Sequence, residues 1–419
     1  MDSRGHPTVG CVVSLVGGGQ GRATIPAGAS TGRHEAAELR DGGEAYEGLG
    51  VSRAVRNVGT ELAAAVVGMN ASDQSGVDAA LTAADGSVDL SRLGANAVLA
   101  VSIATAIAAA AGAGLPLYAS LVEQHGDTLL PLPMVNIISG GAHAGAAIDV
   151  QDFLAVPLRA ESFRDAIDAA ARVRRATAEV FAERGLVSTL VADEGGLAAQ
   201  LPANRVALEI LTRGIERAGF VPGTDIGIAI DVAASQLWEP GDHYRLRQED
   251  RVLTGAELLA EIRSWCDEFA VVSVEDPVGE DDWVNWRLAR RTLPDVQLVG
   301  DDLIVTDRIR LQRAIDEDCA SAVLVKPNQR GTLTAAAELV QQAQRADFAT
   351  VISARSGETE DSWLADLVVA WRGGQIKVGS TMRSERTAKW NRLLEIEALG
   401  TGSASYAGAG ALRPAPTRP

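Results

Sequence analysis

The sequence predicts an α/β protein in which a barrel of repeated strand–helix units follows a smaller α+β domain. From about residue 130, short apolar segments alternate with amphipathic ones, as is typical of parallel βα units. With 419 residues, 47% of them apolar, the chain is long enough for two domains and a sizeable core. We place the α+β domain at residues 1–125, the barrel at 126–405 and an unstructured tail at 406–419.

The net charge and the cysteines restrict the possible partners and the compartment. A formal net charge of −17 argues against nucleic acid or an anionic membrane surface as a partner and is compatible with sites that collect divalent cations. Three scattered cysteines predict neither a disulfide framework nor a zinc site. No secretory leader opens the chain, so we expect a protein of the reducing cytoplasm.

The first 125 residues contain three kinds of segment. Residues 1–25 alternate apolar and polar side chains around a glycine-rich turn at 17–21, which predicts a β-hairpin. The glycine-rich run 26–35 predicts either a mobile loop that closes over a ligand or an ordinary connection. Residues 51–120 indicate helices, and the apolar run 97–113 among them predicts a buried helix and not a membrane span.

The predicted barrel strands share one feature, because each ends in a group that can ionise. The ends are Asp193 with Glu194, Asp231, Glu275, Asp301 with Asp302, Lys326, Arg355 and Lys377. In a (β/α)₈ barrel the carboxyl ends of the strands converge on one face, where the chemistry occurs. Each buried charge costs free energy unless it is paired or bound to a metal. We therefore interpret these ends as one site.

Three of the ends are carboxylates from successive strands. Asp231, Glu275 and Asp301 would offer hard oxygen ligands without cysteine or a histidine cluster, a set that suits Mg²⁺. The alternative is that each carboxylate caps the helix that follows its strand. Three in succession favour the metal site.

Lys326 is the candidate general base. The chain has 38 basic residues, but only Lys326, Lys377 and Lys389 are lysines. An ammonium group can lose its proton and a guanidinium effectively cannot. A chain this rich in arginine therefore needs lysine at a position where the basic residue transfers a proton. A metal and a neighbouring cation would lower its pKa toward that of a working base. The alternative is a lysine that extends from a strand end into solvent.

The remaining ends complete the expected chemistry. Glu194, before two glycines, is the candidate acid, and Lys377, Arg355 and Ser356 offer a cationic clamp for an anionic group. A base, an acid, a metal and an anion clamp predict proton abstraction beside a carboxylate, followed by loss of a leaving group. The expected partner is a small anionic substrate.

Ten ordered motifs over nearly the whole chain resemble those of the enolase family. They are Asp2–Thr8, Gly28–Gly32, Leu93–Ala97, Gly140–His143, Asp193–Gly196, Asp231–Ser235, Ser273–Pro277, Gly300–Leu303, Ser356–Asp361 and Gln375–Lys377. The resemblance implies an α+β capping domain on an enolase-type modified (β/α)₈ TIM barrel and a homodimer or higher homo-oligomer. It also implies removal of water from 2-phosphoglycerate to give phosphoenolpyruvate, with a lysine base and Mg²⁺.

The resemblance also implies roles for individual residues. Asp231, Glu275 and Asp301 match the ligands of the first Mg²⁺, and Ser30 matches the lid serine that joins a second. By the same resemblance Lys326 takes the proton from carbon 2, and Glu194 assists departure of the hydroxyl from carbon 3.

The substrate contacts follow from the same matches. Lys377 corresponds to the lysine that binds the carboxylate, and Arg355 with Ser356 to the phosphoryl clamp. His143 and Gln151 correspond to residues of the mobile loop over the substrate.

The chain departs from the family pattern in three places. It has Ala354 where the family has histidine and Asp152 where the family has glutamate, and we expect the family's first strand to be absent. The shorter Asp152 carboxylate matters because a displacement of about 1 Å can cost about 10²-fold in rate. Ala354 leaves space beside the phosphoryl group.

The matches and the departures together leave three hypotheses open. The retained metal ligands, base and acid favour a changed substrate, as in the enolase-like carboxyphosphonoenolpyruvate synthases of phosphonate biosynthesis. The alternatives are an ordinary phosphopyruvate hydratase and a non-catalytic relative with a binding role.

Overall fold

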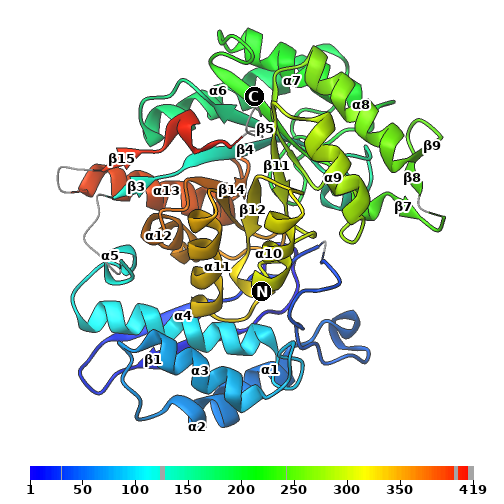
Figure 1. The fold of residues 1–419 in the computed structure, drawn as a ribbon. Helices are drawn as coiled ribbons and strands as arrows, with labels where there is room; N and C mark the ends of the chain where they lie inside the picture. Colours follow the sequence, from blue (N-terminus) through cyan, green and yellow to red (C-terminus); the bar gives the residue numbers. More distant parts are fainter. Residues whose placement is uncertain (30, 123–127, 242, 401–403, 414–419) are drawn as a thin grey trace.

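The computed structural model describes the chain apart from residues 30, 123–127, 242, 401–403 and 414–419. An N-terminal domain lies against one end of a larger barrel domain, shown below it in blue and cyan in Figure 1. The predicted boundary at 125 and 126 falls outside the described residues.

The N-terminal domain contains the predicted hairpin. β1 (Gly10–Ser14) and β2 (Gln20–Thr24) pair antiparallel and pack on helix α4 (Ala95–Gly112). The strand has glycine at Gly21 because a Cβ there would collide with the backbone of Ala104 in that helix. The other helical segments are η1 (Ala45–Gly48), α1 (Ser52–Asn57), η2 (Val58–Leu62), α2 (Ala63–Val66), α3 (Gln74–Asp85) and α5 (Leu117–Ser120).

Helix α4 is the predicted buried helix. Among the described residues it is the one helix long and apolar enough to cross a membrane, and 78% of it is buried inside the protein. A helix that is apolar on every side belongs to a protein core when neighbouring elements cover it. The prediction of a core helix is confirmed.

The barrel is closed, with strand order β10-β11-β12-β13-β14-β4-β5-β6. Its strands are β4 (Leu132–Ser139), β5 (Asp152–Pro157), β6 (Ile226–Asp231), β10 (Val271–Glu275), β11 (Gln297–Gly300), β12 (Ala322–Val325), β13 (Ala349–Ser353) and β14 (Gln375–Gly379). The barrel departs from the pattern of parallel βα units at β5, a strand that the sequence did not reveal and that pairs antiparallel with both β4 and β6. The connection 140–151 holds only η3 (Gly141–Ala144), too little for the helical crossover that parallel neighbours require.

The segment Leu190–Glu194 is not the barrel strand that its apolar residues predict. It lies in the connection between α6 (Phe163–Glu183) and α7 (Asn204–Arg217), where Val191 forms one isolated bridge with Leu197. β6 pairs directly with β5, which leaves no place between them for another strand. Gly195 turns the backbone after Glu194 with a φ of +83°.

Helices cover the outside of the barrel (Figure 1). They are α8 (Gly255–Glu268), α9 (Trp283–Thr292), α10 (Arg308–Asp316), α11 (Leu333–Arg345), α12 (Trp363–Ala370) and α13 (Ser384–Leu399), with η4 (Ala234–Gln236) and η5 (Pro327–Gln329) between elements. A small antiparallel sheet of β7 (Trp238–Glu239), β8 (His243–Leu246) and β9 (Arg251–Thr254) extends from the barrel beside α8.

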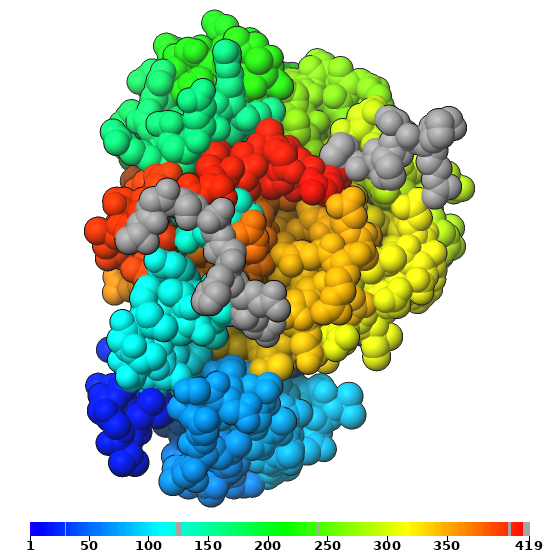
Figure 2. Space-filling model, turned by 60° about the vertical axis from the view of Figure 1, so that its left-hand side comes forward, coloured from blue at the N-terminus to red at the C-terminus, as the bar shows by residue number. Residues whose placement is uncertain are grey.

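The prediction that the tail is unstructured from residue 406 is wrong for its first part. β15 (Ser405–Tyr406) pairs with β3 (Leu129–Leu130), and η6 (Gly408–Ala411) follows. Side chains of the barrel bind this segment: Gln375 Nε2 donates to the Ala411 carbonyl at 3.0 Å, and Gln297 Oε1 accepts from the backbone of Arg413 at 3.1 Å. Figure 2 shows the segment in red, lying over the barrel.

Candidate active site

The charged strand ends converge on one buried hollow, as the sequence predicts. Asp231 ends β6, Glu275 ends β10, Asp301 follows β11, Lys326 follows β12, and Lys377 lies within β14. All five residues are buried, and none is more than 7% exposed. The hollow is lined by Gly28, His143, Gln151, Glu194, Asp231, Asp301, Lys326, Ser353, Ala354, Arg355, Ser356 and Lys377. Ser30 lies outside the described residues.

Lys377 joins two of the acidic ends. Its Nζ donates to Asp231 Oδ2 at 2.7 Å and to Glu275 Oε2 at 2.8 Å. Burial alone lowers the pKa of Lys377, but the two carboxylates outweigh it, so the pKa lies well above its usual value. Gln151 Nε2 also donates to Asp231 Oδ2, at 3.1 Å.

Asp231, Glu275 and Asp301, which we call the acidic cluster, have the composition of a magnesium site. Burial and the Asp231 carboxylate raise the pKa of Glu275 well above its usual value, although the Lys377 ammonium group opposes this. Glu275 Oε1 is buried, and within the described residues it has no hydrogen-bond partner. Asp231, Glu275 and Asp301 therefore fit Mg²⁺, which prefers carboxylate oxygens. Among the described residues, the acidic side chains whose oxygens lie within 4.8 Å of one another are Asp276, Asp301 and Asp302, a group that shares only Asp301 with the predicted ligands.

Lys326 is buried, so the alternative of a lysine extending into solvent is wrong. It is 7% exposed, and its Nζ donates to Asp301 Oδ2 at 2.5 Å. Burial lowers the pKa of Lys326, but Asp301 outweighs it, so the pKa is raised. The protein groups alone thus do not provide the lowered pKa of a working base. A cation bound by Asp301 would oppose the effect of its charge.

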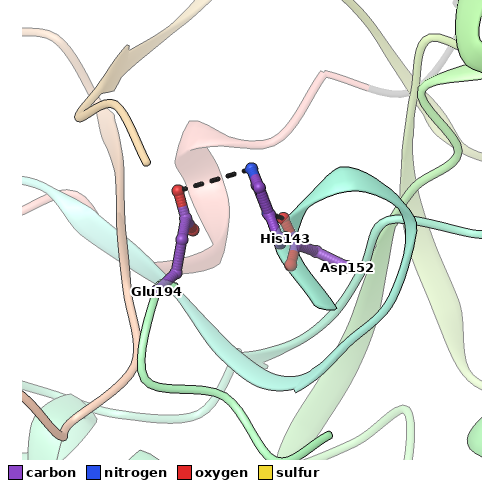
Figure 3. Close-up of side chains that lie close together, drawn as sticks. All are labelled: His143, Asp152 and Glu194. Carbon is purple, nitrogen blue, oxygen red and sulfur yellow. Dashed lines mark hydrogen bonds and ion pairs between the residues drawn. The ribbon is translucent and has the colours of Figure 1, made fainter. Parts of the chain in front are cut away.

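The side chains of His143, Asp152 and Glu194 lie close together (Figure 3). His143 Nδ1 lies 2.9 Å from Asp152 Oδ2, and its Nε2 lies 3.9 Å from Glu194 Oε1. Asp152 Oδ1 accepts a hydrogen bond from Asn136 Nδ2 at 2.5 Å. The shorter carboxylate at position 152 is therefore a partner of the imidazole.

The charges in this group depend on one another. Burial lowers the pKa of His143, but Asp152 and Glu194 outweigh it and raise the pKa to about 9. Burial raises the pKa of Glu194, but His143 and Arg386 outweigh it and lower the pKa. An imidazolium therefore faces a carboxylate, which places a proton beside the candidate acid.

The anion clamp is held by residues that the sequence did not assign to it. Arg355 NH1 donates to Glu35 Oε2 at 3.0 Å and to Asn328 Oδ1 at 2.9 Å, and NH2 donates to Glu35 Oε1 at 3.2 Å. Ser356 Oγ accepts from the backbone N–H of Ala29 at 2.5 Å. Position along the chain gives no signal for these contacts, because Glu35 and Arg355 are 320 residues apart.

Lys389, the third lysine, supports the clamp through Glu358. It is 1% exposed, and its Nζ donates to Glu358 Oε2 at 2.8 Å, to the Thr359 carbonyl at 2.5 Å and to the Glu385 carbonyl at 2.9 Å. Glu358 Oε1 in turn accepts from the backbone N–H of Arg355 at 3.2 Å. One of the three lysines therefore has a supporting role in place of a chemical one.

The glycine-rich segment 28–35 closes the hollow. Arg33 Nε lies 2.6 Å from Glu280 Oε1 and its NH2 lies 2.7 Å from Asp281 Oδ2, both on the connection after β10. The cavity left beneath is about 20 Å³, enough for roughly one water molecule. We call the described part of this segment, residues 28–29 and 31–35, the lid, because Gly28 lines the hollow and Arg33 holds the segment to the connection after β10.

Comparison with known families agrees with this division of the chain. A family model described as the enolase N-terminal domain matches residues 1–121. A second, described as the enolase C-terminal TIM barrel domain, matches residues 127–415. The matches cover almost the whole chain, and the second extends through the segment after β15.

Proposed function

Because this chain belongs to the enolase family, we propose that it is a magnesium-dependent hydro-lyase acting on a 2-phosphoglycerate-type substrate. The observation that carries the proposal is one buried hollow lined by both Lys326 and Glu194, with the carboxylates of Asp231 and Asp301 beside them. A base and an acid that line one closed cavity can remove a proton and a hydroxyl from adjacent carbons. The product is an enolpyruvate.

Each side chain then has a defined task. Lys326 Nζ, as the neutral amine, takes the proton from carbon 2 and becomes an ammonium group. A proton from the pair of His143 and Glu194 leaves with the hydroxyl of carbon 3 as water. Lys377 binds the substrate carboxylate, and Arg355 with Ser356 binds the phosphoryl group. Asp231, Glu275 and Asp301 would hold Mg²⁺, which supplies positive charge to the enediolate.

The preferred substrate in this proposal has a substituent on its phosphoryl group, as in carboxyphosphonoenolpyruvate synthases of phosphonate biosynthesis. The methyl group of Ala354 lines the hollow beside Arg355 and Ser356, where the family's histidine would fill space. A second cavity of about 310 Å³ reaches Arg355 from the lid side and is bounded by Asn328 and Glu35. The space beside the clamp that supports the proposal is this second cavity, because the hollow lined by Ala354 measures only about 20 Å³.

The test compares two substrates on one protein. We expect the purified enzyme with Mg²⁺ to show a higher kcat/KM for a carboxyphosphono-substituted glycerate than for 2-phosphoglycerate. Turnover of 2-phosphoglycerate at ordinary enolase rates would favour phosphopyruvate hydratase instead. A biological role that survives Lys326→Ala would favour a non-catalytic relative.

We further propose that the enzyme acts in the cytoplasm as a homodimer or higher homo-oligomer, in keeping with its family. Light scattering of the purified chain tests the assembly, and a monomer at micromolar concentration would contradict it.

A further inference from the structure

Glu35 is the one described lid side chain that contacts the clamp arginine through both oxygens of a carboxylate. Its side chain is 10% exposed and that of Arg355 is 3% exposed, so the pair is shielded from water. Oε2 accepts from Arg355 NH1 at 3.0 Å and Oε1 accepts from NH2 at 3.2 Å. Two parallel bonds fix both the position and the plane of a guanidinium group.

The same carboxylate also holds the lid. Oε1 of Glu35 accepts the backbone N–H of Gly32 at 3.0 Å, which closes the turn of the lid. Gln329 Nε2 lies 3.4 Å from this oxygen and donates to Asp301 Oδ1 at 3.2 Å. One carboxylate thus connects the lid backbone to the clamp and, through Gln329, to the acidic cluster.

The charge of Glu35 suits Arg355 but would oppose a bound phosphoryl group. A phosphoryl group bound by Arg355 would have a carboxylate as a near neighbour, and like charges at close range repel. A residue that only competes with the substrate would weaken binding. A residue that orients the arginine would strengthen it in spite of the repulsion.

We propose that Glu35 is a positioning residue for phosphoryl binding, which sets the orientation of the Arg355 guanidinium when the lid closes. The proposal rests on the proposed function in taking the ligand of Arg355 to be a phosphoryl group. In this proposal Glu35 raises the affinity for the substrate through Arg355, without touching the substrate itself.

The test measures inorganic phosphate binding to the full chain by titration calorimetry with Mg²⁺ present. The variants are Glu35→Gln, which removes the charge at nearly constant shape, and Glu35→Asp, which keeps the charge but shortens the reach. The matched control is Glu38→Gln, because Glu38 lines the same cavity as Arg355 but pairs with Arg40 at 2.7 Å. Both glutamine variants change the net charge equally.

Positioning and competition predict opposite signs. We expect phosphate to bind about tenfold more weakly to Glu35→Gln and Glu35→Asp, and equally or up to about threefold more tightly to Glu38→Gln. Tighter binding to Glu35→Gln, or wild-type affinity in Glu35→Asp, would overturn the proposal. A wild-type protein that does not bind phosphate would overturn it as well.

Two further readouts separate this role from a general loss of structure. Trypsin cleavage after Arg33, followed by mass spectrometry, should accelerate several-fold in Glu35→Gln and not in Glu38→Gln, since Arg33 is exposed in the lid. With substrate, KM should rise by a larger factor than kcat falls. If the phosphate pattern holds while no lyase activity is found, the proposed function fails and the role of Glu35 stands.

Discussion

Replacing Lys389 by methionine should destabilise the whole protein. The exchange keeps most of the side-chain volume but removes the ammonium group that serves three acceptors, one of them the Glu358 carboxylate. The side chains of this ion pair are 1% and 3% exposed, so the remaining carboxylate cannot reach water. Breaking a buried pair from one side costs about 3–5 kcal/mol.

That free energy converts to a measurable temperature. An unfolding entropy of about 2.1 cal/mol/K per residue gives roughly 0.9 kcal/mol/K for 419 residues, so Tm should fall by about 3–6 °C. Differential scanning calorimetry in one buffer measures this directly. Because the Glu358 carboxylate causes the loss, adding Glu358→Gln to Lys389→Met should recover part of it.

An exposed ion pair provides the control. Arg308 and Glu338 lie 2.7 Å apart with side chains 52% and 49% exposed, so Arg308→Met should shift Tm by about 1 °C or less. If Lys389→Met shifts Tm no more than Arg308→Met does, the reasoning about the buried pair is refuted.

Two further predictions concern the clamp and the acidic cluster. Ala354→His should fill the space beside Arg355. As a result, kcat/KM for the phosphoryl-substituted substrate should fall at least about tenfold relative to kcat/KM for 2-phosphoglycerate. An unchanged ratio of the two kcat/KM values would contradict the role of Ala354. Burial and Asp301 raise the pKa of Asp302 to about 8, so the folded chain holds this proton more tightly than the unfolded chain. In EDTA, the Tm of the wild-type protein should therefore decrease as pH rises from about 5 to 8, and the Tm of Asp302→Asn should decrease less. Equal slopes of Tm against pH in the two proteins would contradict the raised pKa of Asp302.

Local patterns predicted the elements that depend on local interactions. The alternation around residues 17–21 predicted the hairpin, and the uninterrupted apolar run predicted helix α4. The convergence of Asp231, Asp301 and Lys326 could be predicted because the ends of neighbouring parallel strands meet on one face.

The remaining features depend on contacts that no local pattern encodes. The antiparallel β5 follows from a short connection, and the apolar residues 190–194 resemble a strand but have no free neighbour to pair with. The tail consists mainly of small residues and prolines, yet two buried glutamines of the barrel bind it. Glu35 contacts Arg355 across a separation of 320 residues. The raised pKa of Lys326 depends on its 2.5 Å contact with Asp301.

The division of labour between Lys326 and Glu194 is tested most directly by solvent deuterium exchange at carbon 2 of the preferred substrate, followed by NMR. Wild-type enzyme should both exchange this proton and release water. Glu194→Gln should continue to exchange it while elimination falls by at least about 10²-fold, and Lys326→Met should do neither. Exchange at the wild-type rate in Lys326→Met would contradict the assignment of the base.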